Sequence, residues 1–262
     1  MGDTIKLSIA KGRADITLNR PEIHNAFDQA LISHLAQILD ELESNTQVRV
    51  IVLSGAGKSF SAGGDLNWMR RTASQSFDEN LADAKALAAL LNRLDTLSKP
   101  TIARIHGQAL GGGVGLVSCC DIAVAAPEAS FSLSEVKLGL IPATISPYVT
   151  AAMGARAARR YFLTGERFSA AEALRLGLVH DVVPLADLDQ AVDRLVASLL
   201  ANGPEAIAHT KDLIRLVAKA PIDDALKDET AGRIAKRRAS LEGKEGVTAF
   251  LEKRKPSWQE GS

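Results

Sequence analysis

The sequence of 262 residues predicts an α/β fold whose C-terminal third is helical. Two observations lead to this prediction. In the first half of the chain, short apolar runs typical of buried strands alternate with segments that have a helical spacing of apolar residues. From about residue 145 onward the strand-like runs almost vanish. Strands separated by helices favour a layered sheet with right-handed crossover connections.

The predicted elements follow one another in a simple order. A hairpin is expected over residues 5–21, with its turn at Lys11-Gly12. A helix follows, because apolar residues recur there at helical spacing, namely Leu31, Leu35, Ile38, Leu39 and Leu42. Three short apolar runs are predicted to be strands, at 48–55, 100–107 and 121–127. Four later segments are predicted helices, several of which begin after Ser, Asp or Pro and end at Gly: 169–179, 186–203, 204–220 and 221–243.

The composition excludes several classes of protein. Lys and Arg together number 31, as do Asp and Glu, and this zero net charge disfavours nucleic-acid or membrane-surface binding. The only cysteines, Cys119 and Cys120, are adjacent, so they cannot form a disulfide framework or a four-ligand metal site. We expect buried, reduced thiols. With no run of 18 apolar residues and no signal-like segment, the sequence predicts a soluble, cytoplasmic protein.

Two glycine-rich turns are the first candidates for chemistry. Residues 58–66 (KSFSAGGDL) follow the strand that ends at Gly55, and residues 110–116 (LGGGVGL) follow the one that ends at Gly107. Neither has the pattern of a phosphate loop. A glycine turn that opens a helix presents unpaired N–H groups at a positive dipole end. Either turn alone is explained by tight packing, but the pair predicts an oxyanion hole, with two N–H donors aimed at one oxygen.

Glu135 is the candidate acid–base residue. It lies in a mostly apolar stretch, 131–149, where a carboxyl group is expected to have a raised pKa. The alternative is a helix cap, because residues 132–135 (SLSE) have the spacing of a capping box, and local sequence alone favours that cap. The five histidines are scattered without metal-ligand spacing, so no metal site is predicted.

Four segments carry a resemblance to a known family over essentially the whole chain. They are FSAGGDL (60–66), GGGVGLVSCCDIAVAAPEASFSLSEVKLGLIP (111–142), YFLTGERFSAAEALRLGLVHDVVP (161–184) and EGVTAFLEKRKPSW (245–258). The chain resembles the crotonase superfamily of enoyl-CoA hydratases and isomerases. The resemblance implies a spiral of ββα units over 1–195 that holds a thioester site, and a helical trimerisation region over 196–262. It also implies a trimer or a dimer of trimers, acyl-CoA substrates, and no metal or redox cofactor.

The resemblance also implies roles for particular residues. The backbone N–H groups of Ala62 and Gly112 would hold the thioester oxygen, and Glu135 matches one of the family's two catalytic glutamates. Lys253, in a basic stretch near the C-terminus, would contact a phosphate of CoA, from its own or a neighbouring subunit. The CoA channel would be lined by the residues that follow Ala62, namely Gly63, Gly64, Asp65 and Leu66.

The position of the family's second glutamate is occupied by Gly115. We therefore expect open space beside the substrate's β-carbon, with room for a β-methyl branch. The segment 110–149 is similar to bacterial methylglutaconyl-CoA hydratase-like members, so the predicted reaction is hydration of a branched or carboxylated 2-enoyl-CoA, such as 3-methylglutaconyl-CoA, in leucine degradation. The alternative is a Δ3,Δ2-enoyl-CoA isomerase with Glu135 as sole base. An RNA-binding protein of the same fold is the third reading, disfavoured by the neutral composition.

Overall fold

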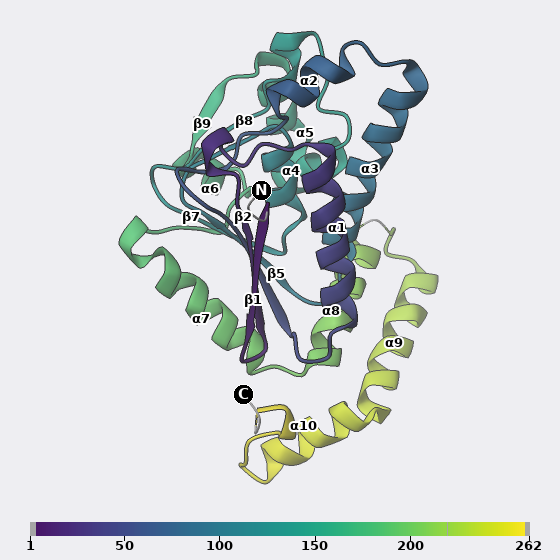
Figure 1. The fold of residues 1–262 in the computed structure, drawn as a ribbon. Coiled ribbons are helices and arrows are strands. Elements are labelled where there is room, and N and C mark those ends of the chain that lie inside the picture. The colour runs from purple at the N-terminus through teal and green to yellow at the C-terminus, as the bar shows by residue number, and fades with distance from the viewer. Residues whose placement is uncertain (1–3, 219, 260–262) are drawn as a thin grey trace.

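Two β-sheets form the centre of the molecule in the computed structural model, which describes residues 4–218 and 220–259 (Figure 1). The strands of the larger sheet stand in the order β1 (Ile5–Ala10), β2 (Arg13–Leu18), β3 (Val50–Gly55), β5 (Thr101–Ile105), β7 (Ile122–Ala125) and β10 (Asp181–Val182). Those of the smaller sheet stand in the order β4 (Ser59–Ser61), β6 (Gln108–Leu110), β8 (Ser130–Ser132) and β9 (Arg167–Ser169). All neighbours are parallel except β1 with β2 and β8 with β9.

The same unit recurs three times along the chain. A strand of the large sheet is followed by a strand of the small sheet and then by helix: β3 and β4 lead to α2 (Leu66–Thr72) and α3 (Phe77–Thr96), β5 and β6 lead to α4 (Gly112–Cys119), and β7 and β8 lead to α5 (Ser146–Thr164). This is the predicted spiral of ββα units, so the α/β fold class is confirmed. The expected strands are also confirmed. So is the hairpin turn, whose residues Lys11 and Gly12 both have positive φ.

Helices cover both faces of the large sheet (Figure 1). On one face, α1 (Gln29–Ser44), α3, α4 and α5 share one core with β2 and the small sheet. All five apolar residues of the predicted helical stripe in α1 are buried there. On the other face, α7 (Leu188–Leu200) packs on Val52, Ile102 and Val124. The described residues also form four short 3₁₀ helices: η1 (Pro21–Ile23), η2 (Glu135–Leu138), η3 (Leu185–Asp187) and η4 (Ser257–Gln259).

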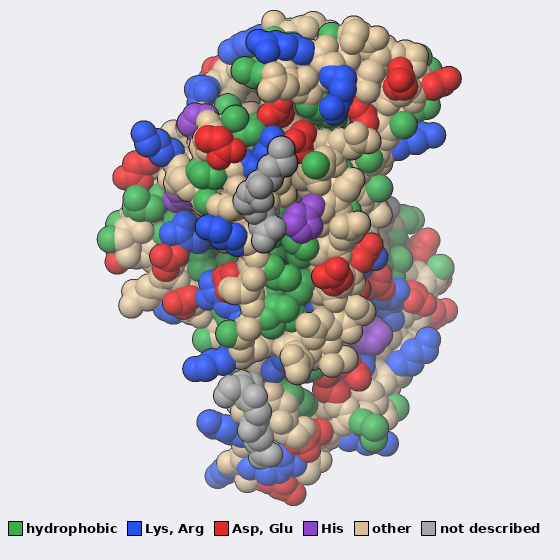
Figure 2. Space-filling model, viewed as in Figure 1, with side chains coloured by type: hydrophobic (Ala, Val, Ile, Leu, Met, Phe, Trp, Pro, Cys, Tyr) green, Lys and Arg blue, Asp and Glu red, His purple; other side chains and the backbone are tan. Residues whose placement is uncertain are grey.

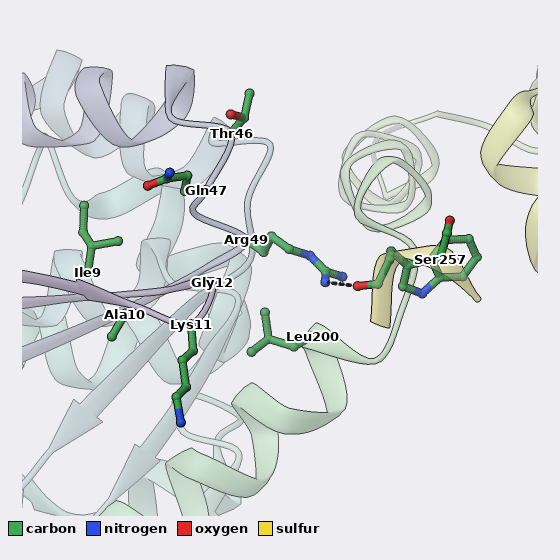
Figure 3. A pocket seen from close by; sticks show the side chains of 10 residues that line it. Ile9, Ala10, Lys11, Gly12, Thr46, Gln47, Arg49, Leu200 and Ser257 are labelled. Carbon is green, nitrogen blue, oxygen red and sulfur yellow. Dashed lines mark hydrogen bonds between the residues drawn. The ribbon is translucent and has the colours of Figure 1, made fainter. Parts of the chain in front are cut away.

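The C-terminal helices lie at one end of the molecule. After α6 (Ala170–Arg175) and α7, the chain forms α8 (Pro204–Val217), α9 (Asp224–Ala239) and α10 (Leu241–Leu251), and Figure 1 shows α9 and α10 extending away from the sheets. A hollow of about 480 Å³ separates the β1–β2 turn from the segment after α10. Arg49 spans it by donating a 2.9 Å hydrogen bond to the carbonyl oxygen of Trp258, the dashed line in Figure 3. It also donates a 2.6 Å hydrogen bond to the carbonyl oxygen of Asn202.

The two cysteines are buried and unbridged at the C-terminal end of α4, as expected. Burial raises the pKa of the Cys120 thiol to about 12 and also raises the pKa of the Cys119 thiol. Within residues 4–218 and 220–259, no group of three or more His, Cys, Asp or Glu side chains is placed to hold a metal ion. None of the helices in this part of the chain has the length and apolar character needed to cross a membrane.

Candidate active site

The two glycine turns lie against each other where the small sheet ends. The first links β4 to α2, and the second links β6 to α4. A Cβ atom placed on Gly63 would lie 2.9 Å from the carbonyl oxygen of Leu110, and one placed on Gly111 would lie 3.9 Å from the Cα of Gly63. Both glycines have positive φ, +83° and +49°. Only glycine allows this conformation together with so close an approach of two backbones.

Ala62 cannot be the N–H donor that the sequence analysis assigned. Its N–H already donates a 2.9 Å hydrogen bond to the carbonyl oxygen of His24. Two residues later, the N–H of Gly64 has no acceptor among the described residues. The assignment of Ala62 is therefore wrong, and the free donor of this turn is Gly64. The residue type could not reveal this, because a long-range contact with residue 24 decides which N–H group is occupied.

Gly112 provides a second free N–H group from the neighbouring turn. It is the first residue of α4, so its N–H has no acceptor within the helix, and it lies at the positive end of the helix dipole. The preceding residue, Gly111, donates a 2.9 Å hydrogen bond to the carbonyl oxygen of Ser132 at the end of β8. The second turn is thereby tied to the strand that leads to Glu135.

Glu135 lies beside the second turn, and one of its carboxyl oxygens has no hydrogen-bond partner among the described residues. Its Oε1 atom lies 3.0 Å from the place that a Cβ on Gly111 would occupy. Its Oε2 atom is buried and has no hydrogen-bond partner. Partial burial raises the pKa of this carboxyl group, because the charged form loses solvation and the hydrogen bond with its own backbone offsets only part of that loss. A half-buried carboxyl group with an unpartnered oxygen, beside the turn that carries the Gly112 N–H, is equipped to move protons next to a developing negative charge.

The capping-box interpretation of residues 132–135 is wrong. The Ser132 hydroxyl donates a 3.2 Å hydrogen bond to the carbonyl oxygen of Gly165, on the loop before β9. The 3₁₀ helix η2 starts after Ser134, which makes no side-chain capping bond. Glu135 is therefore not held as a cap, and its carboxyl group stays available to the site.

Gly115 does not leave open space, contrary to the sequence-based expectation. A Cβ atom at this position would overlap Cγ2 of Ile145 and would lie 3.4 Å from Cδ2 of Leu91. Both side chains are buried in the main core. Ile145 therefore occupies the space into which a side chain at position 115 would extend.

We expect Gly115→Ala to destabilise the protein by about 1–3 kcal/mol, because the added methyl group overpacks a filled core. The free energy of unfolding, measured by chemical denaturation, checks this. The double variant Gly115→Ala/Ile145→Ala removes the overlapping Cγ2 atom, so the two substitutions should be less destabilising together than the sum of their separate effects. If Gly115→Ala has the same free energy of unfolding as the wild type, the predicted open space at Gly115 would be supported after all.

Of the other residues at the first turn, Asp65 stabilises the turn and Leu66 is exposed. Asp65 is buried, and its Oδ1 accepts hydrogen bonds from the N–H groups of Asn67 and Trp68, at 2.8 Å and 3.0 Å, which caps α2. Its other oxygen lies 3.5 Å from Arg20. The Asp65 carboxylate thus holds the turn rather than facing a ligand. Leu66 is 71% exposed at the start of α2 and is open to a ligand.

Trp68 and Met69 lie beside Gly64, although neither is among the predicted site residues. A Cβ on Gly64 would lie 2.8 Å from Cε of Met69 and 3.7 Å from Cε3 of Trp68. The Trp68 indole donates a 3.2 Å hydrogen bond to Asp83 of α3. Both side chains therefore lie at the turn that carries the Gly64 N–H.

Lys253 lies far from the glycine turns of its own chain. It follows α10, at the opposite end of the molecule from α2 and α4 (Figure 1). A contact between Lys253 and a CoA molecule bound at these turns would require a second copy of the chain. Of the two alternatives in the sequence analysis, the contact within one chain is wrong.

We expect Glu135→Gln to raise stability at neutral pH. The native carboxyl group binds its proton more tightly than the same group in the unfolded chain, whose ordinary pKa is 4.5. Stability contributed by the protonated form is therefore present below that value and is lost as the pH rises through the native pKa. Gln carries no such penalty. Thermal unfolding should show a higher midpoint for Glu135→Gln at about pH 7.5 and a smaller difference at about pH 4. A lower midpoint at both values would contradict it.

Fold and site together have the character of an acid–base enzyme with an anion-stabilising pocket. The chain belongs to the enoyl-CoA hydratase/isomerase family, whose model matches residues 8–261. The sequence is 35% identical to a putative enoyl-CoA hydratase of Thermus thermophilus, over 95% of this chain and 99% of that one. It is 32% identical to the short-chain-enoyl-CoA hydratase of Clostridium acetobutylicum, over 92% of each chain. The resemblance to the crotonase superfamily is thereby confirmed.

The solved structures agree with the sequence relatives. The crystal structure of an enoyl-CoA hydratase from Shewanella pealeana is 49% identical and superposes with a TM-score of 0.95, over 98% of this chain and 96% of that one. A putative enoyl-CoA hydratase/isomerase from Legionella pneumophila is 44% identical, with a TM-score of 0.93 over 98% and 100% of the two chains. The chain is thus an enzyme of the enoyl-CoA hydratase type.

Proposed function

We propose that the protein adds water to a 2-enoyl-CoA thioester and forms the 3-hydroxyacyl-CoA. The observation that carries the proposal is the buried, unpartnered carboxyl oxygen of Glu135, whose carboxyl group lies against Gly111, while the N–H groups of Gly64 and Gly112 in the two adjoining turns have no acceptor among the described residues. The names of the relatives favour hydration over other reactions of the family. Glu135, Gly64 and Gly112 are accordingly the proposed catalytic groups.

In the proposed mechanism the thioester oxygen accepts hydrogen bonds from Gly64 and Gly112. Glu135 takes a proton from water as the water oxygen bonds to the β-carbon, and the electron pair of the double bond moves toward the thioester to form an enolate. The two N–H donors stabilise the enolate oxygen. Glu135 then returns the same proton to the α-carbon. Its raised pKa suits a group that must act first as base and then as acid.

A Δ3,Δ2-enoyl-CoA isomerase is the second candidate, and the packing at Gly115 favours it. Ile145 fills the place of a second glutamate, so Glu135 is the one carboxyl group that we assign to the chemistry. Moving a proton from the α-carbon to the γ-carbon needs one base, whereas hydration also needs a water molecule held in place. The same two N–H donors would serve either reaction, because both form an enolate.

A substrate panel separates the two reactions and tests the acyl group. Crotonyl-, 3-methylcrotonyl-, 3-methylglutaconyl- and 3-enoyl-CoA are each incubated with the enzyme, and hydrated and isomerised products are resolved by chromatography. Hydration of any 2-enoyl-CoA, with little shift of the 3-enoyl double bond, supports the proposal. Double-bond shift without water addition would establish the isomerase instead.

The branched or carboxylated acyl chain is the finer part of the proposal. It rests on the similarity of residues 110–149 to methylglutaconyl-CoA hydratase-like members, and with it goes the proposed place in leucine degradation. The filled space at Gly115 removes the steric argument for a β-methyl branch there. Preference for 3-methylglutaconyl-CoA over crotonyl-CoA in kcat/KM is the expected result. The proposed chemistry uses only protein groups and calls for no metal or redox cofactor, and we place the protein in the cytoplasm.

Residues 196–262 are proposed to join copies of the chain into a trimer or a dimer of trimers, apart from the thioester domain of residues 1–195. The support is a set of exposed apolar side chains on and around α9 and α10, namely Ile222, Ile234, Leu241, Val247, Phe250 and Leu251. Such a contact could also bring Lys253 to the CoA of a neighbouring copy. Sedimentation of the purified chain tests this, and a monomer at micromolar concentration would refute it.

RNA binding is the least favoured reading. Lys and Arg side chains are interspersed with Asp and Glu on the face shown in Figure 2, and the net charge is zero. A binding titration against salt decides it, because affinity for phosphate groups must fall steeply as salt rises.

A further inference from the structure

The two proposed donors come from different turns, so their separation must be held by something that touches both. An oxyanion hole works only if its donors already stand at the right distance before the charge develops. Gly64 follows β4 and Gly112 follows β6. Neither residue has a side chain that could hold the other. Among the described residues, Phe27 contacts both turns, through its backbone on one side and its ring on the other.

The backbone of Phe27 holds the first donor. Its N–H donates a 2.6 Å hydrogen bond to the carbonyl oxygen of Gly63, and its carbonyl oxygen accepts a 2.7 Å hydrogen bond from the N–H of Asp65. These bonds form an isolated parallel bridge between Phe27 and Gly64. In such a bridge the N–H of the residue between the two bonds points away from the partner segment. Phe27 therefore turns the Gly64 N–H away from itself and leaves it unpaired.

The ring of Phe27 holds the second donor. The side chain is 1% exposed and packs in the main core. A Cβ atom placed on Gly112 would overlap Cε2 of the ring and would lie 2.7 Å from Cδ2. The ring thus lies directly against the Cα of Gly112, where the Cβ of any other residue would overlap it. The ring therefore limits movement of the first residue of α4 toward Phe27.

Phe27 is itself fixed by its neighbours in the chain. Asn25 is fully buried, and its side-chain amide donates 2.9 Å and 2.8 Å hydrogen bonds to the carbonyl oxygens of Ala56 and Ser59. The Ser61 hydroxyl donates a 2.9 Å hydrogen bond to the carbonyl oxygen of Asn25. The segment that carries Phe27 is therefore tied to β4, the strand that leads into the first turn.

We propose that Phe27 is a positioning residue that sets the separation of the Gly64 and Gly112 donors. It does not touch the reacting atoms. The proposal rests on the proposed function, because it assigns a purpose to donors that the proposed mechanism uses. Shortening the ring should leave binding of CoA esters in place while weakening the stabilisation of the enolate.

The first experiment compares Phe27→Leu with the control Phe168→Leu. Phe168 lies in the same core but packs on Phe131 and Tyr161. For Phe27→Leu we expect kcat to fall about 10-fold or more, with KM changed by less than about threefold, because the lost interaction belongs to the transition state. Phe168→Leu should change kcat by less than about twofold even if it lowers the melting temperature as much.

A spectroscopic measurement detects the hydrogen bonds from the Gly64 and Gly112 N–H groups directly. Butyryl-CoA labelled with ¹³C at the thioester carbon is saturated and cannot react. Hydrogen bonds to its carbonyl oxygen shift the ¹³C signal downfield, so we expect the wild-type enzyme to produce a shift that Phe27→Leu reduces. A loss of stability alone would not change this signal in the folded fraction.

A second pair of variants tests the contact from the other side. Gly112→Ala keeps the N–H but places a methyl group against the ring, so kcat should fall about 10-fold or more. In Gly112→Ala/Phe27→Leu the smaller side chain makes room, and part of the lost kcat should return. Because this pair starts from Gly112, it remains informative if Phe27→Leu alone does not fold.

The outcomes separate this proposal from the proposed function. If the wild-type enzyme turns over no enoyl-CoA and shifts no carbonyl signal, the proposed function fails first. If it does both, while Phe27→Leu retains wild-type kcat and carbonyl shift, the positioning role is overturned and the function stands. Losses in Gly112→Ala and Phe27→Leu that simply add in the double variant would equally contradict a shared contact.

Discussion

Glu135→Gln is expected to lower kcat by at least ~100-fold, the usual scale for losing general acid–base catalysis. Gln has the shape of Glu but neither removes a proton from water nor returns one to the α-carbon. KM for enoyl-CoA should change little, because the glycine turns and the CoA contacts remain. Steady-state kinetics of the hydration of crotonyl-CoA and 3-methylglutaconyl-CoA provide the measurement.

The pH dependence gives this experiment a second readout. Glu135 must be ionised to act as base, and its pKa is raised by burial, so kcat should fall on the acidic side at a higher pH than an ordinary carboxyl group would require. That acidic limb should be missing from the residual activity of Glu135→Gln. Glu128→Gln is the matched control, because Glu128 is exposed on the loop before β8. Near-native kcat in Glu135→Gln would remove Glu135 from the chemistry.

Gly64→Pro is expected to lower kcat by ~10²–10³-fold relative to Gly64→Ala, equivalent to about 3–4 kcal/mol of transition-state stabilisation. Proline deletes the backbone N–H, whereas alanine keeps it, and both add the same Cβ atom. That atom would meet the flexible end of Met69, which can move aside. The deleted N–H has no acceptor in the described part of the chain, so the fold loses no hydrogen bond.

The comparison is made on protein whose circular dichroism and melting temperature match the alanine variant. Equal kcat in the two folded variants would exclude Gly64 as a donor. The same pair at Ala62 is the control for position: its N–H is bonded to His24, so Ala62→Pro should act on stability rather than selectively on kcat. A selective loss of kcat at Ala62 would instead restore the original assignment.

Helix α1 and the longer strands of the large sheet were predictable because their signals are local, whereas the two longest helices, α3 and α5, were not predicted. The stripe of leucines in α1 and the apolar runs of β3, β5 and β7 each carry enough residues to set a period, and all of these elements form. The small sheet was not predicted from the residue pattern. Its strands have three residues each, too few to show alternation, and they form because the larger sheet and the turns bring them together.

The candidate site divides in the same way. The sequence by itself determined the family, the α/β fold, the pair of glycine turns, and Glu135 as the carboxyl group beside them, because these depend on residue types and their order along the chain. Only the tertiary structure decided which N–H of the first turn is free, what occupies the space at Gly115, and which residue holds the two donors together. Each of these depends on a contact between residues distant in the chain, of Ala62 with His24, of Gly115 with Ile145, and of Phe27 with Gly64 and Gly112. A hydrogen bond or a van der Waals overlap is set by distance in space, and no local pattern encodes that distance.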